Sequence, residues 1–124
     1  MILVDLKMQK DNLIITLTFE FSISIIKLYK QLIFHKEFVL SKQLLKSGTS
    51  IGANVEEAVA AQSRKDFINK MSIASKESRE TRYWLKLLSR SQMVPEIRFN
   101  EYIFSIENSI RILTRIVKTS QHSI

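Results

Sequence analysis

Apolar residues recur at helical spacing along most of the chain, most regularly near the C-terminus. There they alternate steps of four and three residues. The members of this series are Phe99, Ile103, Ile106, Ile110, Leu113 and Val117. The spacing predicts an amphipathic helix. Pro95 marks the break before it, because the residue preceding a proline disfavours helical geometry.

Three further helices are predicted N-terminal to Pro95. They cover about residues 11–34, 36–61 and 63–92. Asp11 or Asn12 can cap the first of them. The third starts at Ser63, which forms a capping-box-like pair with Asp66. Residues 1–10 show no clear period, so we expect them to form an extended or disordered N-terminal arm.

The composition supports a domain made of a few long helices. The chain of 124 residues contains two glycines and one proline, which leaves few places to turn. Four helices joined by short connections predict an all-α fold, an antiparallel up-down four-helix bundle that forms a single domain over residues 11–124. No stretch reaches the ~20 uninterrupted apolar residues of a membrane span. We therefore expect no membrane partner. Because the chain has no cysteine, we also expect a cytoplasmic protein.

The first predicted helix is apolar over an unusually large part of its circumference. Glu20, Ser24, Lys27 and Gln31 line up on one narrow polar strip, and apolar residues spread over most of the remaining circumference. An ordinary surface helix needs an apolar stripe of only ~100°. This breadth predicts burial on two sides, by the bundle core and by a partner subunit. The alternative is that the helix is deeply buried within its own bundle, without a partner subunit. The candidate oligomer-interface residues are Phe21, Ile25, Leu28 and Leu32.

The stretch KSGTSIGANVEEAVAAQS, residues 46–63, contains both glycines and admits two readings. A phosphate-binding loop of the GxxxxGK[ST] kind needs lysine after its second glycine, but Ala53 follows Gly52 here. The helical apolar period also continues through Gly48 and Gly52. Each glycine costs a helix about 1 kcal/mol relative to alanine. We therefore favour a helix over a loop, with small residues that let a neighbouring backbone approach closely.

The polar side chains of this stretch also leave two interpretations open. They are Ser47, Thr49, Ser50 and Asn54. Exposed polar filler is the commoner case. The alternative is that they satisfy buried carboxylates from a neighbouring helix. Glu77 and Glu80 are the candidates, because they share a sector with Trp84 beside the apolar face of the third helix.

Two motifs in the middle of the chain carry a resemblance to a known family. They are SGTSIGANVEEA, which begins at Ser47, and KESRETRYWLKLL, which begins at Lys76. Together with the surrounding residues 37–88, they resemble the bacterial four-helix-bundle family of rRNA-intervening-sequence proteins, which is described as ribosomal-protein-like. The accessory protein of diversity-generating retroelements is similar.

The resemblance implies an antiparallel four-helix bundle that assembles into a ring, a pentamer, without an established enzymatic activity. Members of the family are encoded within inserts of the large-subunit rRNA gene. The similarity to the retroelement accessory protein implies that this chain binds nucleic acid and a reverse transcriptase.

The residues needed for the commonest catalytic and metal sites are missing from the sequence. No glutamate is followed three residues later by histidine, as in the di-metal sites of many helical bundles. His35 and His122 lie near predicted helix ends, and there is no cysteine. No Gly-x-Ser-x-Gly motif supports a nucleophilic serine. We therefore expect no catalytic residue, no metal and no cofactor.

Positive charge is concentrated on the third predicted helix. The net charge of the chain is +7 and its pI is about 9.8. Residues 63–92 contain eight basic and three acidic residues. Most of these basic residues lie within one third of the helix circumference. They are Arg64, Lys65, Lys76, Arg79, Arg82, Lys86 and Arg90.

A solvated helix face usually interleaves charges of both signs to gain i,i+4 pairs. The segregation of charge here favours a surface that binds a polyanion. Tyr83 and Trp84 could also stack on bases, although a single Trp beside Leu85 and Leu88 is more often packing.

The sequence thus predicts a homo-oligomeric, non-enzymatic protein with one of two roles. It is a module that binds the phosphates of a nucleic acid, or an adaptor with the same fold. The alternative is a protein-interaction scaffold whose basic face docks an acidic partner without binding nucleic acid.

Overall fold

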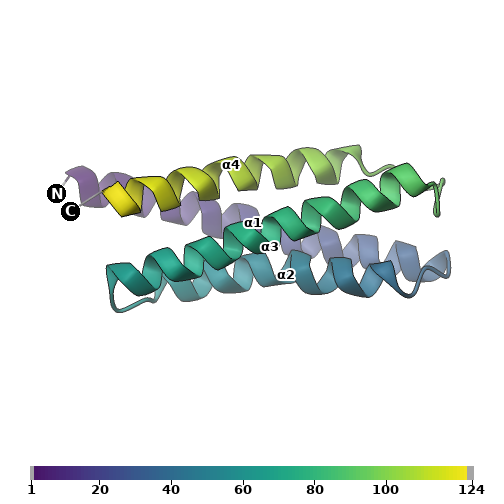
Figure 1. Ribbon diagram of the computed structural model, residues 1–124, viewed down its shortest axis with the longest axis horizontal. Helices are drawn as coiled ribbons and strands as arrows, with labels where there is room; N and C mark the ends of the chain where they lie inside the picture. Colours follow the sequence, from purple (N-terminus) through teal and green to yellow (C-terminus); the bar gives the residue numbers. More distant parts are fainter. Residues whose placement is uncertain (1, 123–124) are drawn as a thin grey trace.

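The computed structural model describes residues 2–122, with side chains described from Leu13 to His122. This part of the chain forms four long helices and no strand. They are α1 (Ile2–Phe34), α2 (Leu40–Val59), α3 (Arg64–Ser91) and α4 (Asn100–His122). The helices run up and down the long axis of the molecule and alternate in direction (Figure 1). The prediction of an all-α, antiparallel four-helix bundle is confirmed.

Neighbours in sequence are neighbours in space. Helix α2 packs against α1 on one side and α3 on the other, α3 packs against α4, and a smaller α4–α1 contact completes the bundle. The core between the helices contains Ile25, Leu44, Met71, Leu85 and Leu113, none of which exposes any surface. Burying such large apolar side chains is the main favourable contribution to the stability of a fold of this kind.

Helix α1 begins at Ile2, so the expectation of a separate arm over residues 1–10 is wrong for residues 2–10. Met1 lies outside the described residues. The chain contains no glycine or proline before Gly48, and these are the residues that most disfavour a helix interior. The irregular apolar pattern of this segment therefore does not stop the helix.

Helix α2 begins at Leu40, four residues later than expected, because a buried glutamate organises the preceding turn. Lys36 has a φ angle of 64°, and the Glu37 side chain turns back toward the start of α2. Its carboxylate accepts hydrogen bonds from the backbone N–H groups of Val39, Leu40 and Ser41. Glu37 therefore satisfies three amides that a helix start leaves without intrahelical partners.

The ends of α3 lie close to the predicted positions. The Ser63 hydroxyl accepts a hydrogen bond from the backbone N–H of Asp66 at 3.0 Å, as the capping pattern predicted. At the other end, Gln92 adopts a left-handed conformation with a φ angle of 58°. After Pro95, the chain enters α4 through the buried Phe99, whose carbonyl accepts from the N–H of Ile103 at 3.0 Å.

The four residues expected to form an oligomer interface are instead core residues of the single chain. Phe21 is 6% exposed, and Ile25, Leu28 and Leu32 are completely buried. The prediction of these residues as an interface is wrong, because they lie on the side of α1 that faces the rest of its own bundle. The outer side of α1 carries other large apolar side chains, including Phe19, Ile26 and Phe34, which are 62%, 42% and 82% exposed.

None of the described helices is long and apolar enough to cross a membrane. In α1 the apolar run is interrupted by Glu20, Lys27 and Lys30.

Candidate nucleic-acid interface

The two glycines lie inside α2, where α1 approaches most closely. A Cβ atom added at Gly48 would lie 2.9 Å from Cγ2 of Ile25. At Gly52 it would lie 3.3 Å from the backbone oxygen of Thr18. Both distances are shorter than ordinary van der Waals contact between such atoms. The helical interpretation of this stretch is therefore confirmed, and its small residues accommodate the side chain and backbone of α1.

The polar side chains of α2 do not meet carboxylates of α3. Thr49 and Ser50 donate to the carbonyls of Leu45 and Lys46, one turn earlier in the same helix. The Asn54 side-chain amide likewise donates to the carbonyl of Ser50 at 2.8 Å.

The carboxylates considered for this role lie outside the core. Glu80 is exposed and accepts a hydrogen bond from Nε1 of Trp84 at 3.1 Å, and Glu77 is only half-buried. The buried-carboxylate interpretation is therefore wrong for the single chain.

A pair of buried hydroxyls fixes α2 against α3 instead. The hydroxyls of Ser47 and Thr81 lie 2.9 Å apart, and both residues are completely buried. Further toward the start of α3, the Lys70 ammonium donates to the Glu57 carboxylate at 2.8 Å. These contacts orient α3 so that the side opposite its core residues is presented to solvent.

All seven basic residues predicted to bind nucleic acid lie on the solvent side of α3 or at its border with α4. Arg82 and Lys86 are half-buried, and the other five are exposed. The structure separates them into two groups. Arg64 and Lys65 occupy the first turn of the helix, about 16 Å along the axis from Lys76. The remaining five extend from Lys76 to Arg90 over about 21 Å.

Helix α4 adds cations that the sequence analysis did not select. Nη2 of Arg79 on α3 donates to Oγ1 of Thr114 on α4 at 3.3 Å. Beside Thr114, the residues Arg111, Arg115 and Lys118 line an open groove of about 300 Å³ together with Ile110. The α3 and α4 cations therefore form one continuous surface. Its members, referred to below as the basic face, are Lys76, Arg79, Arg82, Lys86, Arg90, Arg111, Arg115 and Lys118.

The cations of the basic face are not neutralised within the described part of the chain. The ion pair found there joins Lys70 to Glu57, and His35 lies 4.0 Å from Glu96 and pairs with it only when protonated; neither contact includes a member of the basic face. Lys70 shows what such a partner does, since the hydrogen bond that its ammonium group donates to the Glu57 carboxylate raises the pKa of Lys70. Arg111 instead donates to the neutral side-chain oxygen of Asn108. The positive charge of the basic face is therefore available to an external anion.

No three side chains of the histidine, aspartate or glutamate type come together as metal ligands between Leu13 and His122. The chemistry that this surface offers is electrostatic attraction and multiple N–H donation, which suits phosphate oxygens.

A known protein is similar to this chain in both sequence and fold. It is a protein of unknown function from the S23 ribosomal protein family of Bacteroides thetaiotaomicron VPI-5482, known from its crystal structure. The two share 48% sequence identity and superpose with a TM-score of 0.84, over 89% of this chain and 99% of the other. No protein with a curated description matches the chain.

The sequence also matches the 23S rRNA-intervening sequence protein family over residues 10–115. Because this match covers most of its length, the chain belongs to the 23S rRNA-intervening sequence protein family.

Proposed function

We propose that this protein is a non-enzymatic, oligomeric nucleic-acid-binding module, located in the cytoplasm, that binds phosphates through its basic face. The observation that carries the proposal is the continuous surface of cations on α3 and α4, joined by the Arg79–Thr114 hydrogen bond and without carboxylate partners among the described residues. Self-repulsion within such a surface is unfavourable, and a bound polyanion relieves it. The names of the family and of its relative refer to ribosomes and rRNA, which makes RNA the first candidate.

The shape of the surface favours contacts with the nucleic-acid backbone over base reading in a groove. A helix with its side chains is about 10–12 Å wide, and the major groove of B-DNA is ~12 Å wide. Helix α3 packs on α2 and α4, so the bundle blocks its entry into such a groove. Contacts would therefore be made mainly with phosphates, which position a nucleic acid without reading its sequence.

The proposal includes a homo-oligomer, for which the family resemblance implies five subunits. The exposed apolar residues on the outer side of α1 support it, because several large apolar side chains exposed on one side of a helix favour a protein contact. These residues belong to α1, whereas the basic face belongs to α3 and α4. Each subunit of an oligomer could then present its own basic face, and the simultaneous contacts would raise the overall affinity.

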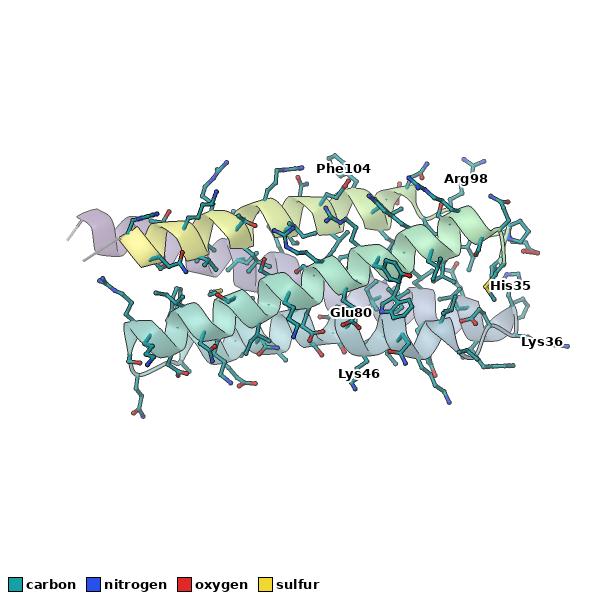
Figure 2. All side chains as sticks on the ribbon, viewed as in Figure 1. His35, Lys36, Lys46, Glu80, Arg98 and Phe104 are labelled. Carbon is teal, nitrogen blue, oxygen red and sulfur yellow. The ribbon has the colours of Figure 1, made fainter. Side chains whose placement is uncertain are left out.

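The proposal is tested with two charge-removal variants that alter the net charge equally. In the test variant, Arg79, Arg82, Lys86 and Arg90 are replaced by glutamine, a comparable helix former. In the matched control, glutamine replaces four exposed cations that lie outside both α1 and the basic face. They are Lys36, Lys42, Lys46 and Arg98. Lys46 points away from the bundle on the α2 side (Figure 2).

Binding to RNA and DNA at low salt should be weakened strongly by the test variant and little by the control. Circular dichroism and light scattering should show unchanged helicity and assembly for both. Equal weakening by the two variants would indicate a diffuse effect of net charge and contradict a defined site. If the parent binds neither RNA nor DNA at low salt, a scaffold that docks an acidic protein becomes the better account.

A further inference from the structure

An exposed tyrosine lies in the middle of the basic face. The Tyr83 side chain is 58% exposed, although tyrosine rings on a packed helix are more often turned toward a neighbour. It lies four residues after Arg79, three before Lys86 and seven before Arg90. At these helical spacings the three cations lie beside the ring on the same face of α3, and the exposed Glu80 lies three residues before Tyr83 on the other side.

The Tyr83 ring contacts the ring of the next residue. The rings of Tyr83 and Trp84 meet edge to face, with centroids 5.1 Å apart and an interplanar angle of 71°. Trp84 is itself half-buried, and its Nε1 donates to the Glu80 carboxylate at 3.1 Å. This contact restricts the Tyr83 ring and so reduces the conformational freedom that it loses when a ligand binds.

We propose that the basic face binds single-stranded nucleic acid and that Tyr83 stacks on one of its bases, while Arg79, Lys86 and Arg90 bind the flanking phosphates. This inference rests on the proposed function and specifies its ligand. Single strands expose base faces to aromatic side chains, and a positively charged surface with an aromatic platform is the usual way to bind them. In a duplex the bases are stacked on one another, and a ring on this surface would reach only the backbone.

The tyrosine hydroxyl offers a different contact, because it can donate a hydrogen bond to a phosphate oxygen of either a single strand or a duplex. The two contacts are separated by paired substitutions. Tyr83→Phe keeps the ring and removes the hydroxyl, whereas Tyr83→Ala removes both. Stacking requires the ring, and phosphate contact requires the hydroxyl.

The experiment measures the affinity of the full-length chain for labelled oligouridylate, which forms no stable internal pairing, and for duplex RNA of the same length. Tyr83→Ala should weaken binding of the oligouridylate by about 5- to 150-fold, the range of one lost base–aromatic stack. Tyr83→Phe should bind it as the parent does. Neither substitution should change the affinity for the duplex, which the parent should bind less tightly than the single strand.

Phe104→Ala is the matched control. Phe104 is 65% exposed on α4 and points outward from the bundle (Figure 2). Glu101 and Glu107 each lie three residues from it, and Arg111 lies seven residues away. Tyr83, by contrast, has one carboxylate, Glu80, and the three cations named above at helical spacing, so the surroundings of Phe104 are less favourable to phosphates. Its replacement should leave binding of oligouridylate unchanged, although it removes an exposed aromatic ring of comparable accessibility.

Three results would overturn the stacking proposal: parent-like binding by Tyr83→Ala, an equal loss in Tyr83→Phe, or tighter binding of the parent to the duplex. The charge-removal variant of α3 distinguishes this failure from failure of the proposed function. If that variant loses affinity while Tyr83→Ala does not, the phosphate-binding site stands and the base contact is refuted. If the parent binds neither of these RNAs nor DNA of either form, both proposals fail.

Discussion

At the scale of single residues, the glycines of α2 determine how closely α1 can pack. Replacing Gly48 with alanine should raise helix propensity by about 1 kcal/mol. The new Cβ would, however, lie 2.9 Å and 3.0 Å from two branch carbons of Ile25, which is completely buried and cannot move away freely. Overpacking of this kind costs ~1–3 kcal/mol. We therefore expect Gly48→Ala to lower the free energy of unfolding measured by chemical denaturation.

A double-mutant cycle identifies the cause of that loss. Ile25→Ala removes both branch carbons and destabilises the core by leaving a cavity. In the Ile25→Ala background, Gly48→Ala should cost less or become stabilising, because the clash is absent. Gln43→Ala, an exposed change on the same helix, should stay within about 0.5 kcal/mol of the parent. If Gly48→Ala stabilises the parent as propensity alone predicts, the close approach of α1 is disproved.

At the scale of secondary-structure elements, Glu37 determines where α2 begins. Its carboxylate accepts from the backbone N–H groups of Val39, Leu40 and Ser41. Loss of a helix cap typically costs about 0.5–2 kcal/mol. Glu37→Ala should therefore lower the free energy of unfolding by an amount in that range. Glu37→Gln, which keeps one acceptor oxygen, should lose less, and stability equal to the parent in both variants would show that the cap contributes nothing.

The elements that the sequence predicts well are those whose ends are set by local chemistry. Helix α3 starts at the Ser63 cap, and the apolar series from Ile103 to Val117 lies within α4. The start of α2 was missed because its amides are satisfied by Glu37, which is separated from the helix by two residues. The start of α1 was missed because its first turns lack a regular period, although nothing in them breaks a helix.

The faces of the helices were predicted less well than their ends. Helix α1 is apolar nearly all round, so periodicity alone cannot tell which side meets the core, and Ile25 and Leu28 were assigned to the wrong side. The contribution of Arg111 and Lys118 to the basic face depends on how α4 is rotated against α3. Packing between the two helices sets that rotation. It cannot be predicted from the sequence of α4 alone.

At the scale of the whole molecule, the outer side of α1 is the expected contact between subunits. Phe19 and Ile26 are exposed in the single chain, so Phe19→Glu or Ile26→Glu should leave the bundle folded and dissociate the oligomer. Ile25→Glu, by contrast, should unfold the chain, because it buries an unpaired carboxylate in the core. Light scattering and circular dichroism measure the two effects separately. A parent protein that is monomeric at micromolar concentration would contradict the assembly.

The central claim is that the basic face binds nucleic acid through phosphates, and the salt dependence of binding tests it most directly. Each neutralised phosphate of a single strand contributes about −0.7 to the slope of log affinity against log salt concentration. If between four and all eight cations of the basic face engage phosphates, oligouridylate should give a slope between about −3 and −6. Glutamine at Arg79, Arg82, Lys86 and Arg90 should make that slope shallower by up to about 3. A slope near zero for the parent, or an unchanged slope in the variant, would contradict the claim.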